Sequence, residues 1–322
     1  MKVFTLFAAM FCTSISLLSQ TKYFEGELVY NVSVKSRVNS LTDNDVRKFL
    51  AASDMLKVSI KNGSYRRSTA LVDEYYIGKD QKVYIKFKRL DTLYYMDYSS
   101  DSSKVTDIIK SDSVFNITGY ACKLLTVKTD ATSKRYIYTS TLLNDPTYDR
   151  TNTIGNFNEY TKATGGAIYL WHRLETPIAA ETDSCVHVEQ KNIDDHIFDL
   201  PTLPIKKFSI ETLISPAKFP GTPDRWSKYL QANLDSKVAD KYLKLPKGQI
   251  EATQKVMVQF TVSETGMLSD IHVVNKDEVH PKLAEEAMRV IRESPRWTPG
   301  VVYGEKMTTT VNQPVTFKVV KG

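Results

Sequence analysis

The chain has little cysteine, no strong excess of one charge and no long apolar run beyond its first 20 residues. Its 322 residues include only three cysteines, and 43 Lys and Arg residues stand against 37 Asp and Glu, a formal net charge of +6. So mild a balance indicates neither nucleic acid nor membrane binding. After residue 20 no run reaches about 18 consecutive apolar residues, which argues against a transmembrane helix there. We expect a folded, globular protein.

Recognisable catalytic motifs are missing as well. The sequence has no glycine-rich phosphate loop and no Gly-x-Ser-x-Gly elbow. The Ser-x-x-Lys pattern at 215–218 lacks the partner motifs of serine enzymes that use it. Cys185, His187 and Glu189 alternate along a predicted strand and could together approach a zinc ion, but a fourth ligand is missing and an ordinary strand face is the simpler interpretation. We therefore expect no enzymatic activity, no cofactor and no metal.

The N-terminus has the pattern of an export signal. Lys2 precedes an apolar run from Val3 to Leu18, and the first acidic residue is Glu25. The run is shorter than the ~20 residues that span a bilayer, so we expect cleavage near residue 20 and a periplasmic protein. An uncleaved membrane anchor is the alternative.

Two cysteines remain after such a cleavage, Cys122 and Cys185. An even pair in an exported protein favours a disulfide, here within the first domain. The alternative is two buried thiols that never meet.

Residues 21–203 are predicted to form one antiparallel β domain. Apolar and polar residues alternate in short runs from Phe24 to Asp199, which is typical of half-buried strands. An Asn62-Gly63 pair between two such runs indicates a tight hairpin. A single helix is predicted at 43–53.

The pattern changes after a proline-rich segment. Residues 204–224 are predicted to be a linker, because five of the 12 prolines fall between 201 and 223. Residues 225–322 then predict a short helix at 226–234, strands at 256–262 and 268–274, a helix at 281–293 and a last strand at 307–319. Pro314 lacks an N–H group and so favours an edge or a bulge for that strand. The fold class expected for the whole chain is α+β.

The C-terminal segment resembles the C-terminal domain of the energy transducer TonB. The resemblance covers about residues 225–320 and depends on the order and spacing of several elements. These are the strand at 256–262, the turn at Gly266, the strand at 271–274, the helix at 284–291, the Pro-x-Trp-x-Pro-Gly motif at 295–300 and the ending at 313–317.

This resemblance implies a small ββαβ domain that binds a partner by strand addition. In the TonB family the partner is a short segment of an outer-membrane receptor. The edge strand here would comprise Val315, Thr316, Phe317, Lys318 and Val319, and its unpaired backbone groups would bind the partner. An edge left unpaired or covered by the other domain is the alternative. The sequence shows neither the anchoring helix nor the long spacer of a transducer, so the resemblance does not extend to coupling with the proton motive force.

The N-terminal region is more weakly similar to exported Bacteroidetes proteins of unknown role. The similarity lies in segments 25–30, 117–123, 135–138 and 197–201. Those proteins in turn resemble the LolA and LolB carriers, which implies a curved, half-barrel-like sheet with a groove for acyl chains. Aromatic residues that could line such a groove, or could simply pack in the core, are Tyr84, Phe87, Tyr94, Tyr95 and Tyr98.

The sequence thus predicts a periplasmic binding protein without enzymatic activity. Its TonB-like domain would engage an outer-membrane receptor or another envelope protein in support of transmembrane transport, and no nucleic acid would bind. The alternative is a lipid or lipoprotein carrier that uses the TonB-like domain as a docking handle. A structural protein without any small ligand is a third possibility.

Overall fold

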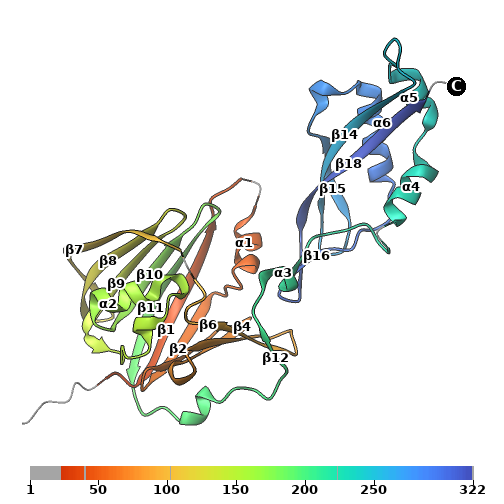
Figure 1. Ribbon diagram of the computed structural model, residues 1–322. Coiled ribbons are helices and arrows are strands. Elements are labelled where there is room, and N and C mark those ends of the chain that lie inside the picture. Colours follow the sequence, from red (N-terminus) through yellow and green to blue (C-terminus); the bar gives the residue numbers. More distant parts are fainter. Residues whose placement is uncertain (1–22, 40, 102, 223, 321–322) are drawn as a thin grey trace, which may run out of the picture.

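The computed structural model describes residues 23–320 except 40, 102 and 223. The predicted export signal at 1–20 lies outside the described residues. Two β-rich bodies follow each other along the chain (Figure 1). Within the described part of the chain, no helix is long and apolar enough to cross a membrane.

A twelve-stranded sheet forms the first body. The strand order is β12-β6-β5-β4-β3-β2-β1-β11-β10-β9-β8-β7, with every neighbouring pair antiparallel except β12 and β6. The strands are β1 (Gly26–Ser36), β2 (Met55–Lys61), β3 (Ser64–Ser68), β4 (Val72–Ile77), β5 (Lys82–Phe87), β6 (Leu93–Asp97), β7 (Val105–Ile117), β8 (Tyr120–Thr129), β9 (Ser133–Leu143), β10 (Ala167–Glu175), β11 (Ala179–Gln190) and β12 (Ile205–Lys207).

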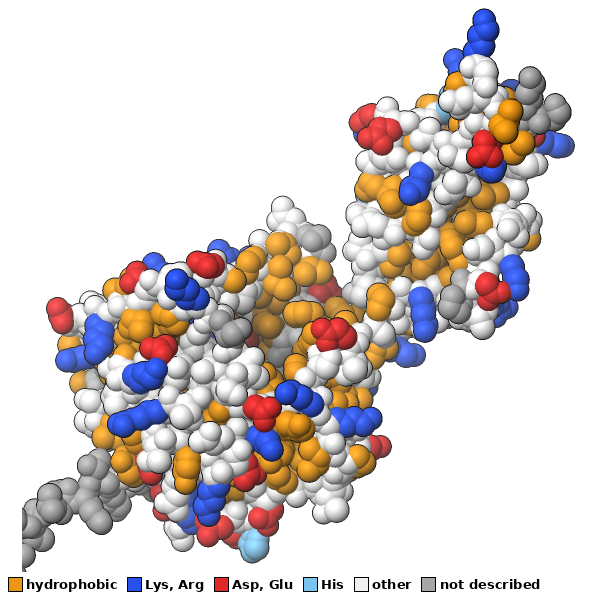
Figure 2. Space-filling model, in the orientation of Figure 1, with side chains coloured by type: hydrophobic (Ala, Val, Ile, Leu, Met, Phe, Trp, Pro, Cys, Tyr) orange, Lys and Arg blue, Asp and Glu red, His pale blue; other side chains and the backbone are white. Residues whose placement is uncertain are grey.

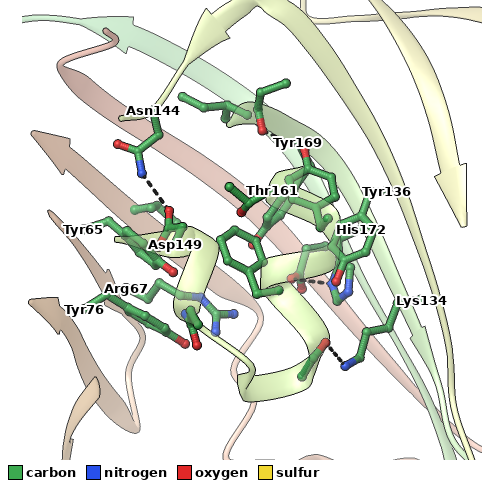
Figure 3. A pocket seen from close by; sticks show the side chains of 18 of the residues that line it. Tyr65, Arg67, Tyr76, Lys134, Tyr136, Asn144, Asp149, Thr161, Tyr169 and His172 are labelled. Carbon is green, nitrogen blue, oxygen red and sulfur yellow. Dashed lines mark hydrogen bonds and ion pairs between the residues drawn. The ribbon is translucent and has the colours of Figure 1, made fainter. Parts of the chain in front are cut away.

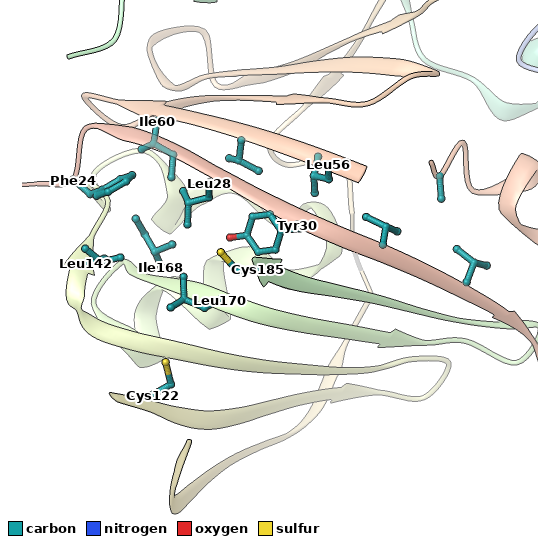
Figure 4. Close-up of a cluster of buried hydrophobic side chains, with 14 of the residues drawn as sticks. Phe24, Leu28, Tyr30, Leu56, Ile60, Cys122, Leu142, Ile168, Leu170 and Cys185 are labelled. Atoms are coloured by element: carbon teal, nitrogen blue, oxygen red, sulfur yellow. The ribbon is translucent and has the colours of Figure 1, made fainter. Parts of the chain in front are cut away.

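Alternation of apolar and polar residues explains how these strands pack. On β1, Leu28, Tyr30 and Val32 are buried on one face in the largest cluster of this body (Figure 4). The predicted hairpin between β2 and β3 is present, and Asn62 and Gly63 both adopt positive φ angles, as its two-residue turn requires.

The sheet curls around a covering segment between β9 and β10. This segment, residues 144–166, contains the helix α2 (Phe157–Thr164), which lies inside the curl in Figure 1. Tyr160 of α2 packs on Tyr136 of β9, with ring centroids 4.4 Å apart. The predicted first helix is shorter than expected: α1 spans Asp43–Phe49 and begins at a capping box formed by Thr42 and Asp45.

The second body is a three-stranded antiparallel sheet with helices against it. The sheet order is β15-β14-β18, so β18 and β15 are its edges. The elements are α4 (Arg225–Asn233), α5 (Ser236–Tyr242), β14 (Glu251–Val262), β15 (Leu268–Val273), α6 (Pro281–Arg292) and β18 (Thr309–Val320). The α+β class is confirmed, with a large curved sheet and a small C-terminal sheet domain.

The Pro-x-Trp-x-Pro-Gly motif closes the core of this second body. Trp297 is 3% exposed and meets Phe260 of β14 edge to face, with ring centroids 4.9 Å apart. Its backbone N–H donates to the carbonyl oxygen of Gly266 over 3.0 Å. Gly266 has a φ of +80°, and a Cβ there would lie 2.1 Å from the carbonyl oxygen of Trp297. Only glycine fits this turn.

Residues 204–224, predicted as a linker, carry short elements that connect the two bodies. These are β12, α3 (Ile210–Leu213) and β13 (Ile214–Ser215), and β13 pairs with β16 (Gly300–Val302) of the hairpin that β17 (Glu305–Met307) completes. Tyr303, at the tip of this hairpin, stacks on Phe87 of the first sheet at 4.3 Å between ring centroids. The C-terminal hairpin therefore packs directly on the N-terminal body.

Candidate functional site

The predicted docking residues all lie on β18, an edge strand that pairs with β14. Val315 and Phe317 point into the core and are 0% and 3% exposed. Thr316 and Lys318 are exposed, and Val319 is half-buried. Contact with a partner through side chains is therefore open mainly to Thr316 and Lys318, while Val315 and Phe317 hold the strand in place.

The register shows which backbone groups of β18 are free. Met257 of β14 accepts from the N–H of Val274, and its own N–H donates to the side chain of Asn275, so both backbone groups point toward β15. Met257 lies opposite Pro314, which places Pro314 in a pair without mutual hydrogen bonds. Along an antiparallel ladder, pairs that exchange hydrogen bonds alternate with pairs that do not, so every second residue has the same orientation. The backbone groups of Thr316 and Lys318 therefore also point away from β14, into the free edge.

A groove with both apolar and polar walls runs beside this edge. The groove has a volume of about 500 Å³ and lies between β18 and the helices α4 and α5. Figure 1 shows both helices beside β18, and Figure 2 shows hydrophobic side chains gathered over the same region. Its apolar lining residues are Trp226, Leu230, Leu234, Ala239, Pro314 and Phe317, and polar residues, among them Gln231 of α4 and Asp235 at the N-cap of α5, complete the wall. A segment added to β18 could place alternate side chains in this groove.

A second candidate site, not predicted from the sequence, is a cavity in the first body. It has a volume of about 280 Å³ and lies between the curved sheet and the covering segment 144–166 (Figure 3). Six tyrosines contribute to its wall: Tyr30, Tyr65, Tyr76, Tyr136, Tyr160 and Tyr169. Tyr65 and Tyr76 stack on each other at 4.1 Å between centroids.

Charged groups are unusually frequent in the wall of this cavity. Arg67 of β3 donates to Glu74 of β4 over 2.8 Å, so this pair is internally neutral. Asp183 of β11 is 1% exposed, and His172 of β10 lies 3.5 Å from it. Glu181 lies two residues before Asp183 on the same strand, and its side chain makes no hydrogen bond or ion pair with any described residue.

Burial raises the pKa of two carboxyl groups at this cavity. The pKa of Glu181 is raised to about 7, first by burial and then by the nearby charge of Asp183. The pKa of Asp149 is also raised to about 7 by burial, although the Nδ2 group of Asn144 donates to it over 3.1 Å. For Glu181 the charges of Arg67 and Arg47 act in the opposite direction and do not outweigh burial.

The aromatic residues expected to line a lipid groove lie elsewhere. Tyr84, Tyr94, Tyr95, Phe87 and Tyr98 do not contribute to the cavity wall. Tyr84 packs with Leu93 in one small cluster, and Phe87 and Tyr98 belong to another that includes the Tyr303 contact. Strands β5 and β6 lie near one end of the sheet, and Tyr98 directly follows β6. Tyr98 meets the covering segment outside the cavity: its carbonyl oxygen accepts from the N–H group of Thr153 over 2.7 Å, and Tyr148 packs against its cluster.

The expected disulfide is wrong for this structure. Cys122 and Cys185 are both free, buried thiols. They lie on β8 and β11, with β9 and β10 between them in the sheet (Figure 4). Three strand spacings of about 4.8 Å separate them along the sheet, whereas a disulfide needs Cα atoms within about 7 Å.

The zinc arrangement considered for β11 is also absent. A β-bulge between Val29 and Tyr30 shifts the register opposite β11. As a result Cys185 is buried while His187 and Glu189 are exposed. Among the described residues no group of three His, Cys, Asp or Glu side chains is arranged to hold a metal ion.

Comparison with known proteins assigns a family to part of the second body. The family model described as Gram-negative bacterial TonB protein C-terminal matches residues 250–319. This match confirms the resemblance found in the sequence and indicates an envelope-associated domain of protein–protein interaction. No curated protein matches the chain.

Solved structures share only a distant likeness. Two crystal forms of PNGF-II match with TM-scores of 0.37 and 0.33 at 8% and 9% identity, covering 76% and 74% of this chain. This chain spans 44% of PNGF-II in each case. An uncharacterized conserved protein from Thermus thermophilus matches with a TM-score of 0.31 at 6% identity, covering 57% of this chain and 91% of its own. At such low scores these likenesses indicate nothing about function.

Proposed function

We propose that this protein is an exported binding protein of the periplasm, without enzymatic activity, that docks an envelope partner by strand addition to β18. The partner would be an extended segment of an outer-membrane receptor or of another envelope protein, and docking would support transport across the outer membrane. The observation that carries the proposal is the free edge of β18 beside a groove, in a domain that the TonB family model matches.

The edge geometry supports a short extended partner. Thr316 and Lys318 present outward N–H and C=O groups, which form a ladder with an added strand. Trp226 and Leu230 of α4 line the adjacent groove and provide apolar contact for side chains of that strand. Backbone bonds would supply much of the affinity, and the groove would supply selectivity.

The experiment compares two substitutions at one position. Lys318→Pro removes an outward N–H group, whereas Lys318→Ala removes only the side chain and its ion pair with Glu251. A photo-cross-linker at Thr316 of the full exported chain would be activated in envelope extract, and the linked peptide would be identified by mass spectrometry. We expect cross-links to a short periplasmic segment of an outer-membrane receptor, kept in Lys318→Ala and lost in Lys318→Pro.

A groove substitution provides an independent check. Leu230→Asp places a charge in the apolar part of the groove, on α4, without touching the backbone of β18, and should also abolish the cross-link. Circular dichroism of each variant confirms that the fold is retained. If Lys318→Pro folds and still cross-links like the wild type, β18 is not the docking edge and the proposal fails.

A lipid or lipoprotein carrier is the weaker proposal. The cavity of the first body is its structural basis, but Glu181, Asp183 and Asp149 in the wall are poorly suited to an acyl chain, because burying carboxylates against hydrocarbon is costly.

A further inference from the structure

The cavity of the first body has features of a ligand site that are independent of the β18 edge. Its volume of about 280 Å³ corresponds to roughly nine water molecules at about 30 Å³ each. That is room for a molecule of about ten non-hydrogen atoms. Such a volume is at the small end of known ligand pockets.

Two carboxylates in the cavity wall, Glu181 and Asp183, form no ion pair with a described lysine or arginine. The guanidinium of Arg67 is paired with Glu74. Its charge also acts against the burial that raises the pKa of Glu181, but the two groups form no ion pair. The ammonium of Lys134 donates to the carbonyl oxygen of Gly155.

Asp183 is the clearest sign of a missing partner. It is 1% exposed, and its Oδ1 atom has no hydrogen-bond donor among the described residues. The imidazole of His172 faces the other carboxylate oxygen, with its Nδ1 atom 3.5 Å away. A buried carboxylate left this way is costly unless a further donor or cation reaches it.

Aromatic rings surround the same part of the cavity. Tyr136 and Tyr169 lie 5.6 Å apart between ring centroids, and the His172 ring lies 4.8 Å from Tyr136. In Figure 3 these side chains converge on the side of the cavity where His172 meets a carboxylate. The faces of tyrosine rings attract cations, and their bodies pack on apolar surface.

We propose that this cavity binds a small organic amine. Its ammonium group would lie against Glu181 and Asp183, and its apolar body would lie between the tyrosine rings and Ile168. Carboxylates that form no ion pair with a described lysine or arginine, an unpartnered buried acceptor and an aromatic wall together select a positively charged N–H donor. An anion of the same size is repelled by the same groups.

Matched pairs of small molecules test the proposal on the wild-type protein. Phenethylamine and hexylamine are titrated calorimetrically into the full exported chain, beside 2-phenylethanol, 1-hexanol and hexanoate. We expect each amine to bind at least about tenfold more tightly than its alcohol, and hexanoate not to bind. Equal affinity of amine and alcohol overturns the proposal, as does the absence of amine binding at about 10 mM. Preferential binding of hexanoate overturns it in favour of a fatty-acid site.

Variants connect the binding to the carboxylates. Glu181→Gln and Asp183→Asn preserve the shapes of the side chains and should each weaken amine binding at least about tenfold. Asp107→Asn, at an exposed position of β7, is the matched control and should leave the affinity for the amine unchanged. If Asp183→Asn impairs folding, Glu181→Gln carries the test. Amine affinity that is unchanged in folded Glu181→Gln contradicts the proposal.

Discussion

Asp149 offers a sharp test of the electrostatics of the first body. Its side chain is 3% exposed and lies at the cavity, where the amide of Asn144 is its hydrogen-bond donor. Burial raises its pKa to about 7 from an ordinary value of 3.8. Asp149→Asn removes the ionisable group and keeps an oxygen that can accept from Asn144.

The sign of the pH effect follows from proton binding in the two states. Between pH 5 and pH 7 the folded protein keeps a proton on Asp149, whereas the unfolded chain has released it. The contribution of Asp149 to the free energy of unfolding is therefore highest at low pH. It falls as the pH rises from 3.8 to about 7 and changes no further above that. Each pH unit in this window is worth about 1.4 kcal/mol, so the wild type loses about 2–3 kcal/mol between pH 5 and pH 8 through this residue.

The assay is urea unfolding of ligand-free wild type and Asp149→Asn at pH 5, 6, 7 and 8, followed in the near ultraviolet. Glu181 titrates in the same range in both proteins, so the difference between them isolates Asp149. We expect the free energy of unfolding of Asp149→Asn, relative to that of the wild type, to rise by about 2–3 kcal/mol from pH 5 to pH 8. Asp107→Asn, at an exposed site, should show no such gain. Parallel pH profiles of the wild type and Asp149→Asn would refute the assignment of a buried, uncompensated carboxylate.

Two further predictions concern the turn at the C-terminal motif and the thiols. Gly266→Ala should lower the free energy of unfolding by at least about 2 kcal/mol, because the added Cβ would clash with the backbone of Trp297. The control is Gly119→Ala, which has a φ of +88° but open space around it and should lower the free energy of unfolding by only about 1 kcal/mol. Equal losses of the two variants in urea unfolding would contradict this prediction. In protein lacking the signal, iodoacetamide should alkylate both Cys122 and Cys185 in denaturant. It should alkylate them only slowly in the native protein, because burial raises the pKa of both thiols. An intact mass about 2 Da below that of the fully reduced chain, measured before alkylation, would instead show a disulfide.

The second body was predictable because its signals are local. Alternation at 256–262 gave β14, although the strand begins earlier, at Glu251. The helix expected at 281–293 is α6, which ends one residue sooner, and Pro281 occupies its first turn. Pro314 indicated an edge, and β18 is one. Each of these features depends on residues close together in the sequence.

The cavity was not predictable in the same way. Arg67, Lys134, Asp149 and Glu181 come from β3, β9, the covering segment and β11, and no spacing in the sequence brings them together. The helix α2 was missed, and Phe157, Tyr160 and Thr161 of this helix form part of the cavity wall. The bulge opposite β11 likewise changed which side chains of that strand are buried, because a shift of one residue inverts the faces.

The edge of β18 combines exposure with protection against indiscriminate pairing. A free edge strand with a full row of N–H and C=O groups tends to pair with any other edge, including that of a second copy. Here Pro314 has no N–H group to present at the edge, and the side chain of Lys318 carries a charge on the same strand. The outward N–H groups of Thr316 and Lys318 lie just beyond the proline, beside the groove formed with α4. Such an edge favours a short segment whose side chains fit the groove and disfavours a long, unspecific strand, which is the selectivity that a docking domain requires.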